Sequence, residues 1–207
     1  MKSSVNSHAP SPYKNLMPTT PSQPALFLDR DGTLIEYVPY LHEPTKVKLL
    51  PGVRNALIRA LEANCLLFIF TNQSGIGREY FKMEDAMACN QQMLELLQLP
   101  PPGITEIKIA PEHPDGQIIY RKPAPRYILE NIEAYALDKA TCFMIGDSAV
   151  DMYAGINAKI QSILVRTGIA GDDLKLQSQA AEYVIPLVSS LEEAVELALR
   201  KTTQVPN

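Results

Sequence analysis

The sequence feature that most constrains the fold is residues 25–33, an apolar run that ends in two aspartates one residue apart, followed by Gly-Thr. Residues 25–28 have the length and composition of a short strand buried on both faces of a parallel sheet, because polar alternation is absent. Such a strand places Asp29 at its carboxyl end, where open α/β sheets bind ligands. Asp29 and Asp31 repel each other unless a cation or a shared proton intervenes, so the pair indicates a hard metal ion, acid–base chemistry, or both. The alternative is a solvated acidic loop.

The composition is that of one ordinary globular domain. The 207 residues carry a net charge of −4, which argues against broad, non-specific nucleic-acid binding. No apolar run reaches the roughly 20 residues that a membrane span needs. The three cysteines (Cys65, Cys89 and Cys142) are far apart and odd in number, so they predict neither a disulfide framework nor a Cys-x-x-Cys metal site. We therefore expect a single domain in a reducing, cytoplasmic environment.

The chain divides into a leader, one domain and a tail. Residues 1–24 are rich in Ser, Pro, Asn and Thr and lack the apolar core of a secretory signal. We interpret them as a disordered leader. Residues 25–200 form the predicted domain, and residues 201–207 a polar tail.

The hydrophobic pattern of the domain alternates between strands and helices. Strands are expected at residues 25–28, 65–70, 104–110, 141–145, 162–165 and 183–186. Helices are expected at residues 52–64, 83–98, 123–136, up to 158 after the fourth strand, and 191–199. This order predicts a Rossmann-like, doubly wound α/β fold, whose sheet is mostly parallel with helices on both faces. A methionine stripe on residues 83–98 is interpreted as helix core rather than as a binding groove.

Polar residues stand where three of the apolar strands stop. They are Asp29 and Asp31, Thr71 and Asn72, and Asp147 and Asp151, and Lys122 begins a helix. In a doubly wound sheet these positions share one crevice. Carboxylates for a cation, hydroxyl and amide donors, and a fixed ammonium group are together what hydrolysis of a phosphate monoester needs, because its anionic oxygens must be neutralised before attack.

Four motifs match those of one family, in the same order along the chain. They are Asp-Arg-Asp-Gly-Thr, Phe-Thr-Asn-Gln-Ser-Gly-Ile, Tyr-Arg-Lys-Pro and Ile-Gly-Asp-Ser-Ala-Val-Asp-Met. The sequence resembles the haloacid dehalogenase (HAD) superfamily of phosphatases, and within it the D,D-heptose 1,7-bisphosphate phosphatase and histidinol-phosphate phosphatase group. The resemblance covers about residues 25–168 and implies a Mg²⁺-dependent phosphatase with a minimal cap or none.

The resemblance also implies roles for single residues. Asp29 would be the nucleophile that forms an aspartyl-phosphate, and Asp31 would protonate the leaving group and then activate water. Asp29, the backbone carbonyl of Asp31, and Asp147 would hold Mg²⁺. Thr71 and Lys122 would bind the transferring phosphoryl group, and Asn72 and Arg121 would contact the substrate. For Asp151, metal support, lysine orientation and a plain exposed carboxylate remain open.

The sequence differs from many members of this family in the loop near the third predicted strand. Relatives often carry a zinc loop with Cys-Pro-His-His-Pro and Cys-x-Cys, but here residues 110–114 read Ala-Pro-Glu-His-Pro and residues 118–120 read Ile-Ile-Tyr. Structural zinc needs about four Cys or His ligands, and only His113 qualifies. We therefore expect no structural zinc in this protein.

The substrate is expected to be a small sugar phosphate, with D-glycero-D-manno-heptose 1,7-bisphosphate as the first candidate. The arginines near the motifs (Arg30, Arg78, Arg121 and Arg126) would suffice for a second phosphate but not for a polyanionic strand. The alternatives are a histidinol-phosphate phosphatase, a polynucleotide 3′-phosphatase, and a catalytically silent binding module on the same fold. We expect a small-molecule partner, no nucleic acid and no membrane, and the sequence leaves the oligomeric state open.

Overall fold

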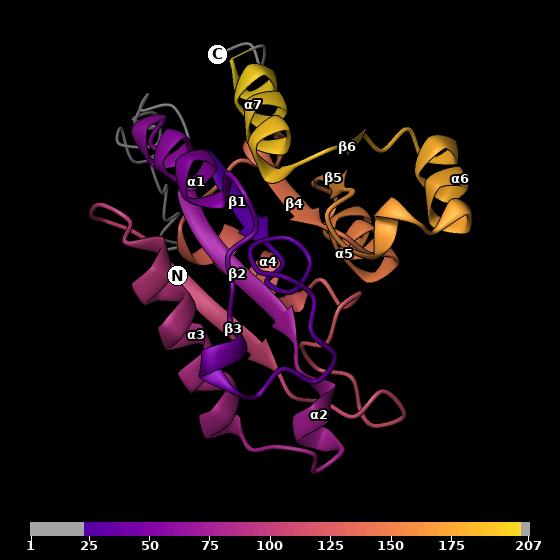
Figure 1. The fold of residues 1–207 in the computed structure, drawn as a ribbon. Coiled ribbons are helices and arrows are strands. Elements are labelled where there is room, and N and C mark those ends of the chain that lie inside the picture. Colours follow the sequence, from indigo (N-terminus) through magenta and orange to yellow (C-terminus); the bar gives the residue numbers. More distant parts are fainter. Residues whose placement is uncertain (1–22, 204–207) are drawn as a thin grey trace, which may run out of the picture.

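The protein is built around one six-stranded parallel sheet, which the computed structural model describes within residues 23–203 (Figure 1). The strands are β1 (Ala25–Leu28), β2 (Leu66–Asn72), β3 (Glu106–Ala110), β4 (Cys142–Gly146), β5 (Gln161–Val165) and β6 (Leu187–Val188). The helices are α1 (Val53–Glu62), α2 (Ser74–Gly77), α3 (Met83–Leu97), α4 (Arg126–Ala134), α5 (Ala149–Ala158), α6 (Leu174–Glu182) and α7 (Leu191–Thr202). Short 3-10 turns lie at Pro44–Lys46, Lys139–Thr141 and Ile169–Gly171.

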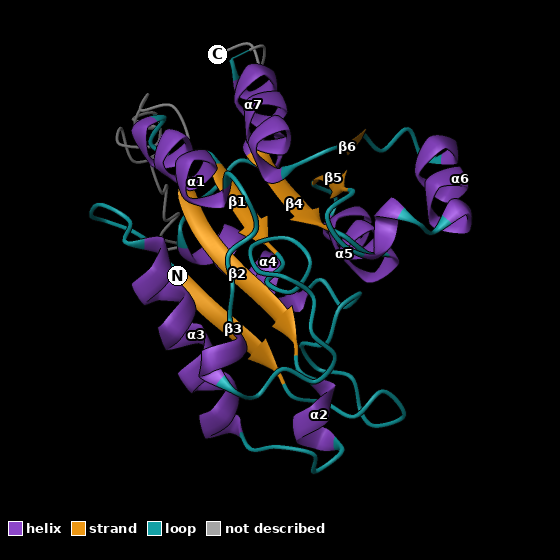
Figure 2. Ribbon diagram, viewed as in Figure 1, coloured by secondary structure: helices purple, strands orange, loops and turns teal. Residues whose placement is uncertain are grey.

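Helices cover both faces of the sheet (Figure 2). An apolar layer lies between the sheet and the helices on each face. Leu26 and Leu28 of β1 pack in the layer shared with α1, α3 and α7. Phe27 points the other way and packs in the layer shared with α4 and α5. Successive side chains of a strand face opposite sides of its sheet, so a strand covered on both faces is apolar at every position. The predicted doubly wound α/β fold is confirmed.

The strand order creates a switch point at the carboxyl end of β1. The sheet runs β3-β2-β1-β4-β5-β6, so the chain moves from β1 to one side and later returns to the other. β1 pairs in parallel with both β2 and β4, and Leu28 lies beside Ile69 and Ile145. Loops that leave β1 and β4 therefore diverge above a shared crevice, which is where such sheets bind ligands.

The predicted sixth strand, at residues 183–186, is wrong. The sixth strand is Leu187–Val188, and the preceding residues 174–182 form helix α6, which the pattern did not indicate. Val184 is 85% exposed, so the apolar run that suggested a strand there is not buried. Helix α6 buries only Leu176 and Ala180, and so narrow an apolar face gives little helical periodicity.

Two smaller differences concern the segment between β2 and β3. The stretch after β2, expected as a loop, contains the single turn of helix α2. Helix α3 forms as predicted and buries Met93 and Leu97, but Met87 is 57% exposed and does not belong to the core.

Residues 1–22 of the predicted leader (residues 1–24) and residues 204–207 of the predicted tail (residues 201–207) lie outside the described part of the chain. Lys201 and Thr202, predicted as tail, belong instead to α7, which ends at Thr202. Among residues 23–203, none of the helices has the length and hydrophobicity to cross a bilayer.

Candidate active site

Asp29 stands at the switch point, directly after β1. Its backbone N–H donates to the carbonyl of Ile145 on β4 (2.9 Å), which extends the ladder between the two central strands. Asp29 as a whole is 8% exposed, and its Oδ1 accepts from the backbone N–H of Arg30 (2.7 Å). The strand pairing therefore fixes one carboxylate at the bottom of the crevice.

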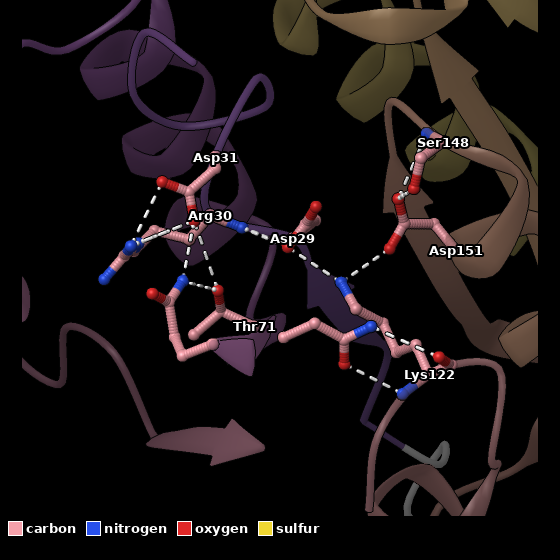
Figure 3. A network of polar contacts seen from close by, with 9 residues as sticks. Asp29, Arg30, Asp31, Thr71, Lys122, Ser148 and Asp151 are labelled. Carbon is pink, nitrogen blue, oxygen red and sulfur yellow. Dashed lines mark hydrogen bonds and ion pairs between the residues drawn. The ribbon is translucent and has the colours of Figure 1, made fainter. Parts of the chain in front are cut away.

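Lys122 joins Asp29 to Asp151 (Figure 3). The Nζ of Lys122 lies 2.7 Å from Asp29 Oδ1 and 2.6 Å from Asp151 Oδ1, and its side chain is 1% exposed. Burial opposes the charge on Lys122, but the carboxylates of Asp151 and Asp29 outweigh it and raise its pKa. The ammonium group is therefore charged and fixed where the carboxyl ends of the strands meet.

Asp151 orients this lysine. It is 1% exposed, and its Oδ2 accepts from the backbone N–H (3.1 Å) and the hydroxyl of Ser148. Together these contacts form a capping box at the start of α5. Of the alternatives left open for Asp151, the structure rules out an exposed carboxylate and supports lysine orientation. The Ser-x-x-Asp spacing is the sequence signal that predicts this contact.

Asp147 directly follows the end of β4 and is 2% exposed. A Cβ on either Gly32 or Gly168 would collide with its carboxylate, so the two glycines let the backbone approach closely. Asp147 Oδ2 accepts from the backbone N–H of Ile169 (2.7 Å). Burial, followed by repulsion from Asp151, raises the pKa of Asp147 to about 6.

Three of these carboxylates form a cluster that fits a divalent cation. Each of Asp29, Asp147 and Asp151 offers one oxygen, and the three oxygens lie within 4.8 Å of one another. Burial, and then repulsion from Asp151, raises the pKa of Asp29 well above its ordinary value despite the nearby ammonium of Lys122. The buried carboxylates repel one another with little solvent to screen them, and a bound hard cation would relieve this repulsion.

The side chain of Asp31 is held apart from this cluster. Its Oδ1 accepts from Arg30 Nη2 (3.0 Å), and its Oδ2 accepts from Arg30 Nε (3.1 Å), Gln73 Nε2 (3.0 Å) and Thr71 Oγ1 (3.3 Å). Thr71, expected to bind a phosphoryl group, is 1% exposed and lies beside this carboxylate. Gln73 is a member of the site that the sequence analysis missed, although it follows directly in the Thr-Asn-Gln motif.

Two of the arginines expected near a second phosphate lie elsewhere. Arg30 is fully buried, and its guanidinium also donates to Asn90 (2.9 Å) on α3, so it supports Asp31 rather than facing a ligand. Arg126 pairs on the surface with Glu130 (2.7 Å). Asp-x-Asp spacing alone does not reveal which way the intervening side chain points.

The segment that carries Arg121 and Lys122 is held by its backbone. The side chain of Asn72 donates to the carbonyl of Lys122 (3.2 Å) and accepts from its N–H (2.9 Å). Glu112 Oε1 accepts from the N–H groups of Tyr120 (2.6 Å) and Arg121 (3.3 Å). Three consecutive backbone N–H groups are therefore bound by two side chains. Asn72 therefore positions this segment, and its predicted contact with the substrate stays a prediction.

A cleft of about 310 Å³ opens above these groups. Six of the seven predicted site residues line it: Asp29, Asp31, Thr71, Asn72, Arg121 and Lys122. The seventh, Asp147, lies beneath it within the acidic cluster. Residues 37–41 and Phe81 also line the cleft, and no motif in the sequence predicted them there.

Comparisons with known proteins point to one kind of enzyme. A family model described as "HAD-hyrolase-like" matches residues 119–194. The D-glycero-beta-D-manno-heptose-1,7-bisphosphate 7-phosphatase of Pasteurella multocida is 35% identical over 181 residues, which cover 83% of this chain and 96% of that protein. The enzyme of the same name from Escherichia coli is 30% identical over 84% of this chain and 95% of its own length.

A solved structure agrees with these sequence matches. The D,D-heptose 1,7-bisphosphate phosphatase of B. bronchiseptica, in complex with magnesium and phosphate, superposes with a TM-score of 0.77 at 27% identity. The match covers 86% of this chain and 99% of that chain. The fold is therefore shared over most of both chains with a phosphatase whose structure contains these two ligands.

Proposed function

The chain belongs to the heptose-bisphosphate phosphatase family of HAD-like hydrolases and is a phosphatase, and from this membership we propose that it removes one phosphoryl group from a sugar bisphosphate with the help of Mg²⁺. The substrate we propose is D-glycero-D-manno-heptose 1,7-bisphosphate, which the names of the relatives give for those proteins. The observation that carries the proposal is the ammonium of Lys122, held 2.7 Å from Asp29 in a buried cluster of three carboxylates.

Asp29 is the proposed nucleophile. Its carboxylate lies at the bottom of the cleft, and Lys122 on one of its oxygens leaves the other free to attack phosphorus. The bond between phosphorus and the sugar oxygen breaks as an aspartyl-phosphate forms, and water then attacks the same phosphorus to release inorganic phosphate.

Asp31 is the proposed acid and base. In its acid form it would donate a proton to the departing sugar oxygen, and as a carboxylate it would then take a proton from the attacking water. Asp31 lines the same cleft as Asp29. Its carboxylate is held in place by hydrogen bonds from Arg30, Thr71 and Gln73. An acid–base group that is oriented before the substrate binds loses less entropy in the reaction, so these contacts support the proposed role.

Mg²⁺ would be held by Asp29, Asp147 and the backbone carbonyl of Asp31. The oxygens of Asp29 and Asp147 lie within 4.8 Å of one another and satisfy the preference of Mg²⁺ for carboxylate ligands. When bound, the ion would neutralise charge on the phosphoryl oxygens and on the carboxylates. Lys122 supplies a second positive charge to the phosphoryl group, and Thr71 supplies a hydroxyl donor.

Arg121 is the proposed contact for the remaining phosphate of the bisphosphate. It lines the cleft beside Lys122, and its buried Nη1 has no hydrogen-bond partner among the described residues. A buried guanidinium nitrogen without a partner is costly unless a ligand completes it. A phosphate, which accepts two parallel hydrogen bonds from a guanidinium, fits that role.

We also propose that no structural zinc holds the loop between β3 and Lys122. Glu112 does so instead through the backbone N–H groups of Tyr120 and Arg121. In elemental analysis of protein purified without added metal, we expect zinc far below one equivalent per chain. Zinc near one equivalent, released only by a strong chelator with loss of stability, would refute this.

A kinetic comparison tests the proposed substrate. We expect kcat/KM with Mg²⁺ to be highest for the heptose bisphosphate, lower for histidinol phosphate, and lowest for an oligonucleotide 3′-phosphate, because the net charge of −4 disfavours a polyanion. A higher value for the oligonucleotide or for histidinol phosphate would overturn the proposed substrate. An absence of turnover on every phosphate monoester would overturn the proposed mechanism.

A further inference from the structure

An aromatic wall stands at the mouth of the cleft, and the proposed chemistry does not use it. Tyr37 and Tyr40 line the cleft and are 54% and 47% exposed, and the neighbouring Tyr80 is 58% exposed. Large aromatic side chains exposed together beside a functional cleft mark a binding surface more often than chance exposure does.

Contacts between two segments hold this wall in place. The rings of Tyr40 and Tyr80 meet edge to face with their centroids 4.8 Å apart. In the same two segments, the ring of His42 stacks on the ring of Phe81 with their centroids 5.7 Å apart. The two pairs connect the loop after β1 to the segment after α2, so the exposed rings of Tyr40 and Tyr80 are oriented before any ligand binds.

The backbone of Tyr40 is in an unusual conformation. Seven non-glycine residues of the described chain have positive φ, and six of them lie within two residues of a helix C-terminus, where this conformation is common: Asn64, Glu79, Gln98, Ala136, Lys159 and Val184. Tyr40, with φ of 52°, lies instead in the loop between β1 and the turn at Pro44–Lys46. A glycine would adopt this conformation at lower cost, so the backbone at Tyr40 is strained.

A cationic group lies in the same cleft as the aromatic wall. Arg121 lines it, and burial chiefly lowers the pKa of this guanidinium. Arg121 Nη1 and Arg78 Nε are both buried without a hydrogen-bond partner among residues 23–203. A ligand that suits both features has a ring with an apolar face and an anionic group attached to it.

We propose that Tyr37, Tyr40 and Tyr80 form a subsite that packs against the C–H face of a sugar ring, and that this subsite makes the enzyme selective for cyclic over open-chain phosphate esters. The inference rests on the proposed function, since it names the part of the substrate that the catalytic groups do not touch. Tyr40 would supply only one face of this packing, so removal of its ring should weaken the binding of a cyclic substrate about tenfold rather than abolish it.

The test compares Tyr40→Ala and Tyr40→Phe on two kinds of substrate. The cyclic substrates are the heptose bisphosphate and glucose 1-phosphate, and the open-chain substrate is glycerol 3-phosphate. We expect Tyr40→Ala to lower kcat/KM for the cyclic substrates about tenfold, mainly through KM, and to leave the open-chain substrate within about twofold. Tyr40→Phe keeps the ring face and is expected to stay near wild type on both kinds.

Tyr183→Ala is the matched control, because Tyr183 is 49% exposed and pairs with Tyr153, away from the cleft. Equal losses on cyclic and open-chain substrates, or no loss on either, overturn the proposal. A loss in Tyr40→Phe as large as in Tyr40→Ala also overturns it, since the hydroxyl and not the ring face would then carry the effect. Tyr80→Ala repeats the test if Tyr40→Ala does not fold.

The proposed function and this inference fail in different ways. If the heptose bisphosphate is a poor substrate, the proposed substrate fails while glucose 1-phosphate still reports the preference for a ring. If wild-type protein turns over none of the esters, calorimetric binding of glucose 1-phosphate and glycerol 3-phosphate to wild type and Tyr40→Ala decides instead. Equal affinities in the two proteins then contradict the aromatic subsite.

Discussion

The bottom and the mouth of the cleft are built on opposite principles. At the bottom, Asp29, Lys122, Asp147 and Asp151 are each at most 8% exposed. Lys122 is bound to two carboxylates, and Asp147 accepts from a backbone N–H. At the mouth, the tyrosines are about half exposed, and Arg121 has a nitrogen without a partner among the described residues.

This difference separates chemistry from selectivity. Asp29 and Asp147 directly follow β1 and β4, and Asp151 lies in the first turn of α5, so the sheet sets the geometry of these carboxylates. Lys122 comes from the segment before α4, and its ion pairs to Asp29 and Asp151 hold it against them. The groups at the mouth lie on loops, which a rigid scaffold positions and which vary more readily than the scaffold does. We therefore expect changes at the bottom to affect every substrate alike, and changes at the mouth to affect substrates unequally.

The largest expected effect comes from Asp29→Asn. The substitution keeps the shape of the side chain but removes the nucleophilic charge, so kcat should fall by about 10³-fold or more on every phosphate ester. Steady-state assays with Mg²⁺ measure this loss, and the circular dichroism spectrum checks the fold. A kcat within about tenfold of wild type, after subtraction of the activity of a preparation from cells without the gene, would contradict the role of Asp29.

Asp151→Asn should have the next largest effect. Lys122 loses one of its two carboxylate partners, so its ammonium is positioned less well against the phosphoryl group. We expect kcat to fall about 10²-fold with little change in KM, on cyclic and open-chain esters alike. Ser148→Ala removes only the hydroxyl contact to Asp151 and should have a smaller effect. A loss confined to one substrate class would contradict the division between bottom and mouth.

The third prediction concerns how the stability of the metal-free protein depends on pH. The pKa of Asp147 is raised from 3.8 to about 6, chiefly by burial. Because the folded state holds this proton more tightly, the contribution of Asp147 favours folding below about pH 4 and is lost as the pH rises through about 6. The loss should be on the order of 2–3 kcal/mol in free energy of unfolding.

Urea unfolding of chelated wild type and Asp147→Asn at several pH values measures this dependence. Other carboxyl groups titrate in both proteins, so the difference between the two isolates Asp147. We expect the variant to be the more stable one at pH 7, and Mg²⁺ to stabilise the wild type only. If the difference in free energy of unfolding between the two proteins does not change with pH, then burial does not raise the pKa of Asp147.

The smallest expected effect comes from Glu112→Ala. Without the carboxylate, the N–H groups of Tyr120 and Arg121 lose their shared acceptor, and Arg121 is held less firmly. We expect kcat/KM for the bisphosphate to fall about tenfold through KM, with a monophosphate less affected. Glu112→Gln retains an acceptor oxygen and should recover most of the loss. Equal losses on both substrates would indicate that the loop also positions Lys122.

The bottom of the cleft was predictable from sequence because short-range patterns encode it. An apolar strand that ends in Asp29 fixes both the burial and the direction of that carboxylate. Arg30 shows the limit of this reasoning, since a charged residue inside the motif was expected near a phosphate and is buried against Asn90 on α3. Its partner is 60 residues away, and no local spacing reports such a contact.

The mouth of the cleft and the last strand could not be predicted from the sequence, and the two reasons are related. Tyr40 and Tyr80 meet through the packing of two loops, and neither loop has a periodic pattern. Near the C-terminus, Val184 belongs to an apolar run that resembles a strand, yet it is exposed after the narrow amphipathic helix α6. Local hydrophobicity does not report which neighbour is available to cover a segment.

The most direct test of the account is the mass of the Asp31→Asn protein after it reacts with an aryl phosphate. An aryl oxide leaves without a proton from Asp31, so Asp29 should still be phosphorylated, whereas hydrolysis of the aspartyl-phosphate lacks its base. We predict that intact mass spectrometry shows one added phosphoryl group per chain, that peptide mapping places it on Asp29, and that Asp31→Asn combined with Asp29→Asn shows none. An unmodified Asp31→Asn protein that still releases phosphate, or a phosphoryl group on another residue, would contradict the central role of Asp29.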